Sequence, residues 1–401
     1  MDPNRLIAPG PKRILALDGG GVRGMITLAI LERIESLLAK ATGRTDGSFR
    51  LADYYDLIGG TSTGSIIATG LAIGHSASDL LAMYRDMSGR VFRRSMWRLG
   101  LFGPKFARGP LNEVLTTVLG DAAFDSPRLQ TGLAVVTKRA DNGSVWVLTN
   151  NPRGRYYDAP EDDPQAFPNR KIKLVSAILA STAAPTFFQP EFFEIARGLR
   201  GGFVDGSASP HNNPSLMLFL LATLRGYNFN WQVGETNLLL TSVGTGVFRR
   251  RSTEEEVRRM LPAQLAVNAL VSMIDDSNRL NQALLQLLGE TPTGRVVDSE
   301  MGDLAGDKLT EHKLLHYLRY DAQLEIDWLD KTLNIQISPE DIKRVQAMDN
   351  PAAMDTLIDI GRAIAEHHVS ISHFPEIFSR TIWSPGTPGD AEGPTATSGL
   401  R

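Results

Sequence analysis

The sequence predicts an α/β fold with a largely parallel central sheet, followed by a helical C-terminal part. Twice before residue 75, a short apolar run passes through a glycine-rich loop into a segment with apolar residues at helical spacing. Further apolar runs recur as far as residue 243, and helix-capping patterns take over beyond residue 250. Strands that alternate with helices in this way usually pair in parallel, which favours helices packed on a shared sheet.

The first two strand–helix units carry the glycine-rich loops. A buried strand is expected over Arg13–Asp18, with a helix over Met25–Lys40. The second strand, Tyr54–Ile58, turns sharply through glycines into a helix over Ser65–Ile73. Later, a hairpin is expected with strands over 133–137 and 145–148 around the turn at 141–143. A helix over 173–181 and two further strands, over 203–204 and 237–243, follow it.

The C-terminal part is marked by helix-start signals. Thr253 and Glu256 form a capping-box pattern, and Ser338 and Asn350 each precede a proline that fits a first helical turn. The last residues are rich in Gly, Pro, Thr and Ser, a composition typical of a disordered tail. The expected divisions are a flexible leader (1–12), an α/β domain (13–250), a helical part packed on it (251–383) and a disordered tail (384–401).

Composition narrows the class of protein. The net charge of −3 over 401 residues argues against a partner that is a nucleic-acid polymer. The chain has no cysteine, which excludes disulfides, zinc–thiolate sites and thiol nucleophiles. The segment Met1–Lys12 is polar, and no run approaches the ~18 apolar residues of a membrane span. We therefore expect a cytoplasmic protein whose membrane contact, if any, is peripheral at the inner face.

The segment 60–64, with the sequence GTSTG, matches the nucleophile elbow of serine hydrolases. Gly60 and Gly64 permit a turn so crowded that Ser62 is exposed at the carboxyl end of the sheet. The helix that follows directs its N-terminal amides at the same place and favours negative charge there. A simple structural turn is the alternative interpretation.

A second glycine loop, 18–24 with the sequence DGGGVRG, also fits the dinucleotide fingerprint G-x-G-x-x-G. That fingerprint requires an acidic residue at the end of the next strand, whereas 43–48 resembles a loop. Three successive glycines also suit an oxyanion hole, since their amides are unhindered. Asp205 follows a short apolar strand and precedes Gly206, although an Asp-Gly pair is most often only a turn.

These motifs, in this order, resemble the patatin-like phospholipase family. The resemblance adds Asn212-Asn213-Pro214 after the aspartate and two connecting stretches, 180–188 and 242–246, and it covers roughly Arg13 to Arg250. It implies a three-layer α/β/α hydrolase that cleaves fatty-acyl esters of phospholipids or lysophospholipids without a metal or organic cofactor. The serine at position 207, where many relatives have glycine, puts only the local loop shape in doubt.

The resemblance implies a Ser–Asp dyad in which Ser62 attacks the ester carbonyl and Asp205 takes its proton. The backbone amides of Gly19, Gly20 and Gly21 would form the oxyanion hole, while Arg23 and Gly24 support the loop. The open alternatives are a thioesterase or neutral-lipid esterase on the same dyad, a dinucleotide-binding protein that uses the first loop, and a phospholipase effector of a bacterial antiphage system activated by a cyclic nucleotide.

Three further groups of residues are weighed against ordinary packing. None of the seven histidines is assigned a proton-transfer role, and no metal site is expected. The segment 93–106 mixes arginines with aromatic residues and could contact anionic lipid, although packing into the core is equally simple. Four phenylalanines could line an acyl groove or pack on the sheet: 187, 188, 192 and 193.

Overall fold

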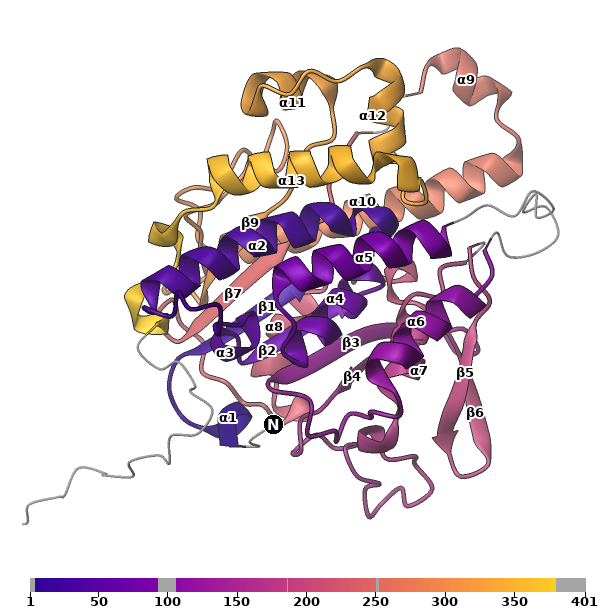
Figure 1. Ribbon diagram of the computed structural model, residues 1–401, viewed down its shortest axis with the longest axis vertical. Helices are drawn as coiled ribbons and strands as arrows, with labels where there is room; N and C mark the ends of the chain where they lie inside the picture. Colours follow the sequence, from indigo (N-terminus) through magenta and orange to yellow (C-terminus); the bar gives the residue numbers. More distant parts are fainter. Residues whose placement is uncertain (1–3, 93–105, 186, 250–251, 380–401) are drawn as a thin grey trace, which may run out of the picture.

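The computed structural model describes residues 4–92, 106–185, 187–249 and 252–379. Within these ranges a mixed sheet of nine strands forms the centre of the molecule, in the order β5-β6-β3-β2-β1-β7-β9-β8, with β4 beside β3 (Figure 1). The strands are β1 (Lys12–Leu17), β2 (Leu57–Thr61), β3 (Gly132–Arg139), β4 (Val145–Thr149), β5 (Glu191–Ala196), β6 (Leu199–Asp205), β7 (Leu238–Val243), β8 (Gly289–Glu290) and β9 (Leu315–Tyr320). The α-helices are α1 (Asn4–Ile7), α2 (Gly24–Ala41), α3 (Leu51–Tyr54), α4 (Thr63–Ala72), α5 (Ala77–Val91), α6 (Gly109–Leu119), α7 (Leu174–Ser181), α8 (Ser215–Thr223), α9 (Glu254–Arg259), α10 (Pro262–Leu288), α11 (Ile326–Leu333), α12 (Pro339–Gln346) and α13 (Met354–His368).

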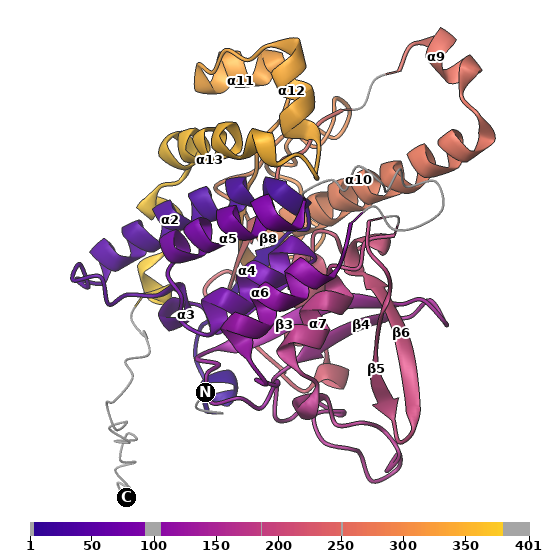
Figure 2. The same ribbon diagram turned by 45° about the vertical axis from the view of Figure 1, so that its right-hand side comes forward.

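Both faces of the sheet are covered, which confirms the predicted three-layer fold. Successive side chains of a strand point to opposite faces, so the residues of β1 alternate between two cores. Leu15 and Leu17 pack with α2, α5 and α7 on one face, while Ile14 and Ala16 pack with α8 on the other. The views in Figures 1 and 2 agree, with α13 lying over α2 and with α11 and α12 beyond α13.

The parallel centre of the sheet confirms the first two predicted units. The strands β1, β2, β7 and β9 pair in parallel, as do β2 and β3. The second strand begins later than predicted, because residues 51–54 form the short helix α3 and β2 continues through Gly59 and Gly60 to Thr61. The glycines obscured the end of this strand, because glycine has a low strand propensity.

The C-terminal part also contributes to the sheet. It is mostly helical, and Thr253 and Ser338 cap α9 and α12 as predicted. However, β9 lies beside β7, and its His316 is on a strand rather than on a helix. Every side chain of β9 is buried, so its sequence lacks the alternation that identifies a half-exposed strand.

The expected flexible leader is corrected for residues 4–12. Residues 4–7 form α1, and Leu6 is buried. Arg5 is also buried and donates hydrogen bonds to the carbonyls of Asp53 and Tyr55, at 3.0 and 2.9 Å. Charged side chains in the leader suggested exposure, but this guanidinium satisfies buried carbonyl groups. The expected tail, 384–401, lies outside the described residues.

Candidate active site

The turn between β2 and α4 has the geometry of a nucleophile elbow. Ser62 has φ 53° and ψ −125°, a conformation that non-glycine residues rarely adopt. The chain can turn this tightly because a Cβ on Gly60 would lie 2.1 Å from the carbonyl oxygen of Gly64, and one on Gly64 would lie 2.1 Å from that of Leu17. The strained backbone holds the Ser62 side chain at the carboxyl edge of the sheet.

The register of β3 explains why Asp205 lies beside this serine. Val136 pairs with Thr61, the last residue of β2, and the next residue of β3, Thr137, pairs with Asp205. The strand β4 occupies the other edge of β3 at these same residues. The strands β2 and β6 therefore lie on the same side of β3 and meet end to end, since β2 runs parallel to β3 and β6 runs antiparallel to it. The two motifs, distant in sequence, are brought together by this junction.

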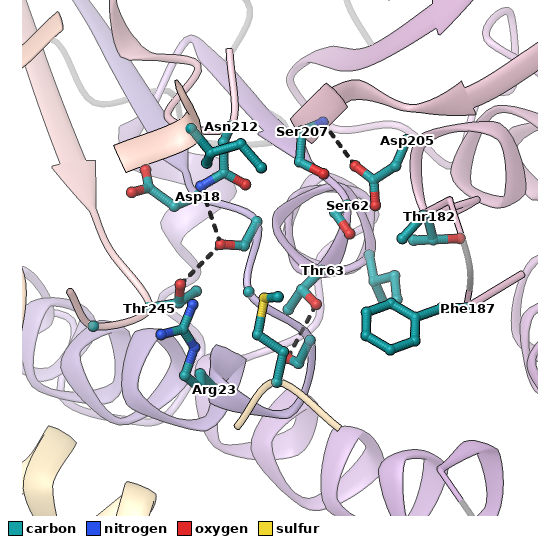
Figure 3. A pocket seen from close by; sticks show the side chains of 18 of the residues that line it. Asp18, Arg23, Ser62, Thr63, Thr182, Phe187, Asp205, Ser207, Asn212 and Thr245 are labelled. Carbon is teal, nitrogen blue, oxygen red and sulfur yellow. Dashed lines mark hydrogen bonds between the residues drawn. The ribbon is translucent and has the colours of Figure 1, made fainter. Parts of the chain in front are cut away.

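The Asp205 carboxylate is 1% exposed and lies next to the Ser62 hydroxyl (Figure 3). Burial raises the pKa of Asp205 to about 6, because a charged carboxylate is poorly solvated there. Hydrogen bonds from the Ser207 backbone N–H, at 2.8 Å, and from the Ser62 hydroxyl oppose this shift. The carboxylate is thus a stronger base than a free aspartate and ionises just below neutral pH.

Ser181, at the end of α7, supports the elbow from behind. Its hydroxyl accepts a hydrogen bond from the Ser62 backbone N–H at 2.8 Å and donates one to the Val136 carbonyl at 2.6 Å. The side chain is fully buried, so its two bonds fix the peptide of Ser62 relative to β3. The stretch 180–188 thus contributes a buried support as well as part of the cavity wall.

The glycine loop after β1 faces the serine. The amide of Gly19 is engaged, since it donates to the Asn212 carbonyl at 3.0 Å. The amides of Gly20 and Gly21 have no acceptor among the described residues. Gly21 has φ +58°, and a Cβ there would lie 2.2 Å from the Met348 carbonyl oxygen, so the loop requires glycine at this position. Of the three amides predicted for the oxyanion hole, two are therefore available.

Two side chains hold the carbonyl of Gly19. Thr245 donates its hydroxyl to this oxygen at 2.8 Å, and the Asn212 side-chain amide donates at 3.5 Å. In a trans peptide the carbonyl and the following N–H point in opposite directions. Holding the Gly19 oxygen therefore directs the Gly20 N–H away from Thr245 and Asn212.

Arg319 on β9 and Asp321 just after it form a buried ion network. This network binds the start of the glycine loop after β1 and the loop that follows β7. The Arg319 guanidinium donates to both carboxylate oxygens of Asp18, at 3.0 and 2.6 Å, and to Asp321 at 2.6 Å. Asp321 in turn accepts from the Gly246 amide at 2.8 Å, next to Thr245. Arg319 and Asp321 were not predicted as site residues, because β9 was not recognised as a strand. Only the parallel register of β7 and β9 could have indicated them.

Arg23 lies beside the cavity rather than at its reacting centre. Its guanidinium stacks over the Phe248 ring at 5.8 Å, and the side chain is 9% exposed. Gly24 allows α2 to approach the elbow closely, since a Cβ there would lie 2.3 Å from the Thr63 side chain. Both positions fit the expected supporting role, which stays a prediction.

A cavity opens beside Ser62 and Asp205 and is lined mainly by apolar side chains. Of the four phenylalanines considered above, Phe187 and Phe188 line this cavity. Phe193 instead stacks on Phe203, with 4.1 Å between the ring centroids, and Phe192 is exposed. The remaining apolar lining includes Ile66, Met87, Val91, Phe92, Leu111, Val247, Val271 and Ile274. Residues 93–105 of the possible membrane-contact segment lie outside the described residues, and Phe106 is buried.

No histidine of the described ranges lines this cavity. His211 is close in sequence to Asp205, yet its side chain lines a different cavity with Trp146 and Met217. His316 and His373 contact each other near the opposite end of β9 through a ring nitrogen and a carbonyl, 2.9 Å apart. Within the same ranges, no three His, Asp or Glu side chains are grouped as metal ligands would be.

The fold and this elbow define an α/β protein with a serine at a nucleophile elbow, a buried carboxylate and an apolar cavity. A profile of the family described as Patatin-like phospholipase matches residues 15–219. The chain belongs to the patatin-like phospholipase family, which confirms the resemblance inferred from its motifs.

Individual relatives agree with this assignment. Over 238 residues the chain is 33% identical to a cGAMP-activated phospholipase of Escherichia coli (strain TW11681), covering 58% of this chain and 62% of the relative. A cGAMP-activated phospholipase of Vibrio cholerae is 32% identical over 51% of this chain and 56% of its own length. Patatin-T5 of Solanum tuberosum is 27% identical over 66% of this chain and 70% of its own length. The chain thus spans less than two thirds of the length of the two bacterial relatives.

Proposed function

We propose that this protein is a serine lipid acyl hydrolase that cleaves fatty-acyl esters of phospholipids or lysophospholipids. The observation that carries this proposal is the pairing of Ser62, on a strained elbow, with the buried Asp205 at the mouth of an apolar cavity. A fatty-acyl chain is the natural occupant of such a cavity, because burial of its methylenes is favourable. Membership of the patatin-like phospholipase family supports the same substrate class.

In the proposed mechanism, the Ser62 oxygen attacks the ester carbonyl while Asp205 accepts the hydroxyl proton. The amides of Gly20 and Gly21 donate to the oxyanion of the tetrahedral intermediate. The intermediate collapses as the alcohol leaves with the proton from Asp205, so that the acyl group remains on Ser62. A water molecule, deprotonated by Asp205, then attacks this ester. The second collapse returns the proton to Ser62 and releases the fatty acid.

The surroundings of the first glycine loop disfavour its use for a dinucleotide. The Val22 amide donates to the Met348 carbonyl at 2.8 Å, at the start of the helical segment where a pyrophosphate would need free amides. The Gly21 backbone faces the same carbonyl. A thioesterase or a neutral-lipid esterase would use the same dyad and cavity, so these alternatives differ from the proposed function only in the substrate that is cleaved.

The direct test is release of fatty acid from phosphatidylglycerol and lysophospholipid vesicles by the full chain, with products identified by mass spectrometry. We expect hydrolysis by the native protein and none by Ser62→Ala. The control is Ser65→Ala, which removes a hydroxyl two residues into α4 that bonds the Ser62 carbonyl at 2.6 Å. Hydrolysis that persists in Ser62→Ala would contradict the proposal.

A second candidate concerns regulation. The relatives in Escherichia coli and Vibrio cholerae are described as cGAMP-activated phospholipases. We infer that this chain also responds to a cyclic nucleotide, as an effector of a bacterial antiphage system. The test is turnover with and without cGAMP, for which we expect a rise on addition. Equal turnover in both conditions would reject regulation by this nucleotide and leave the hydrolase proposal intact.

A further inference from the structure

A second, more polar cavity adjoins the apolar one. Both cavities share the wall residues Val247, Phe248, Asp275 and Asn278. Beyond this shared wall, the lining changes from aliphatic and aromatic side chains to charged and amide groups. The polar cavity lies between α10, β9 and the loops that follow β7 and β8, and its charged and amide lining residues are Arg249, Arg279, Gln282, Arg295, Arg319, Asp321, Gln323 and Glu325.

Two arginines that line this cavity, Arg319 and Arg295, have spare donor capacity. Arg319 is 3% exposed, and its Nε has no hydrogen-bond partner among the described residues, although its terminal nitrogens are paired. The Arg295 guanidinium donates to the Asp321 backbone carbonyl at 2.6 Å, and in the described ranges it has no carboxylate within ion-pair distance. Burial lowers the pKa of Arg295, the nearby Asp321 carboxylate opposes this shift, and repulsion from Arg319 adds to it. Two guanidinium groups held this close are stabilised by an anion.

The carboxylates that line the cavity are largely engaged. Asp321 accepts hydrogen bonds from Arg319 and from two backbone amides. Glu325 accepts a hydrogen bond from the backbone N–H of Arg249 at 3.0 Å, so this bond does not involve the Arg249 guanidinium. Asp275 has a partner of its own. The donors that remain for a ligand therefore exceed the acceptors.

One buried acceptor adds to this picture. The Asn278 side-chain oxygen, at the boundary of the two cavities, has no partner among the described residues. A buried polar atom of this kind is stabilised by a ligand or ordered water that supplies the missing bond. A ligand that satisfies this site carries an anionic group for the arginines and a hydrogen-bond donor for Asn278.

We propose that the polar cavity binds a phosphodiester-bearing ligand, with Arg295 and Arg319 at the phosphate and Asn278 at a hydroxyl or amino group. This inference rests on the proposed hydrolase function. Two sources share the chemistry, the headgroup of the phospholipid whose acyl chain occupies the apolar cavity and a free nucleotide. Either ligand reaches the guanidinium that holds Asp18 and Asp321, so its binding acts on the base of the glycine loop.

The first arm of the test measures cGAMP binding to the full chain by calorimetry, in the Ser62→Ala background so that no turnover intervenes. We compare Arg295→Gln and the exposed Arg279→Gln, which has no ion pair within the described ranges to lose on substitution. The matched control is Arg258→Gln on α9, an exposed arginine outside the cavity that pairs with Glu254. Loss of one charged contact should weaken binding about tenfold.

The second arm compares kcat/KM for phosphatidylglycerol with kcat/KM for diacylglycerol, in the same variants with Ser62 intact. If the cavity variants bind cGAMP more weakly but keep the phosphatidylglycerol-to-diacylglycerol ratio of kcat/KM, the ligand of the cavity is a free nucleotide. No cGAMP binding, together with a loss of about tenfold in the phosphatidylglycerol-to-diacylglycerol ratio, identifies the lipid headgroup. If both Arg279→Gln and Arg295→Gln behave like Arg258→Gln in both arms, the cavity is no phosphodiester site and the inference is overturned. Labelling of Ser62 by a fluorophosphonate is independent of these outcomes, so it separates this failure from failure of the hydrolase proposal.

Discussion

Two regions of the chain contribute differently to the candidate active site. The region matched by the family profile, 15–219, contains the elbow serine, the glycine loop and Asp205. The region from 238 to 348 contains no proposed reacting group, yet Thr245, Arg319 and the Met348 carbonyl contact the glycine loop or its base. The first region supplies the chemistry, and the second fixes the peptide that the chemistry requires. Substitutions in the two regions should therefore affect turnover and stability in different proportions.

The largest expected effect is on turnover, at Asp205. Asp205→Asn removes the proposed base and should lower kcat by at least ~10⁴-fold, by analogy with serine hydrolase sites. In the native protein, activity should be present above pH 6 and fall as the pH drops through about 6, where the carboxylate becomes protonated. The measurement is kcat/KM for a soluble acyl ester from pH 4 to 9. A profile with no inflection in this range would show that Asp205 does not act as the base.

The next effect distinguishes the supporting region. Arg319→Met leaves the carboxylates of Asp18 and Asp321 buried without their cation, and should lower the free energy of unfolding by about 3–5 kcal/mol. Turnover should fall as well, because the base of the glycine loop loosens. Denaturant unfolding and ester assays on the same variant measure both quantities. If Arg319→Met keeps native stability, the ion network does not stabilise the base of the glycine loop.

Asp205→Asn should stabilise the fold at neutral and alkaline pH, whereas Arg319→Met should destabilise it. The pKa of Asp205 is raised from 3.8 to about 6 on folding, so the buried charge destabilises the native state above that pH. The contribution of Asp205 to the free energy of unfolding is therefore most favourable below pH 3.8 and is lost as the pH rises through about 6. Asp205→Asn should then be more stable than the native protein at pH 8, by up to about 3 kcal/mol, with the difference vanishing near pH 4. Equal stability of the two proteins at pH 8 would contradict the assigned burial.

The smallest effect is expected at Thr245. Thr245→Val keeps the shape of the side chain but removes the donor to the Gly19 carbonyl, so the Gly20 amide is less well aimed. We expect kcat to fall about tenfold, less than the loss of an entire oxyanion donor, with KM little changed. Thr245→Ser retains the hydroxyl and should restore turnover. If both variants match the native kcat, the hydroxyl does not position the loop.

A simpler substitution, Gly20→Val, would be a poor test of the oxyanion hole. A Cβ on Gly20 would lie 2.1 Å from the Thr245 hydroxyl oxygen, so the change would disturb packing as well as the amide. In the structure, stability and turnover are expected to fall together.

Much of the fold follows from local sequence patterns, and the site follows only in part. The glycine loops, the capping residues and the alternating strands each carry a short-range signal that is visible without structure. The support from β9 has no such signal, because its contacts with Asp18 join residues about 300 positions apart through sheet register. The position of Asp205 beside Ser62 likewise depends on the end-to-end meeting of β2 and β6, which the pairing of both strands with β3 makes possible. The engaged amide of Gly19 could not be predicted either, since it depends on the course of the 209–214 loop.

The most direct test of the central claim is covalent labelling with a fluorophosphonate, followed by mass mapping of the modified peptide. We predict one labelled residue, Ser62, with labelling lost in Asp205→Asn and retained in the alanine variant of each of the seven histidines, His211 included. Fluorophosphonates report on an activated serine, so a label at another residue would contradict the assignment of the nucleophile. A histidine variant that folds normally but labels as poorly as Asp205→Asn would replace the Ser–Asp pair with a triad.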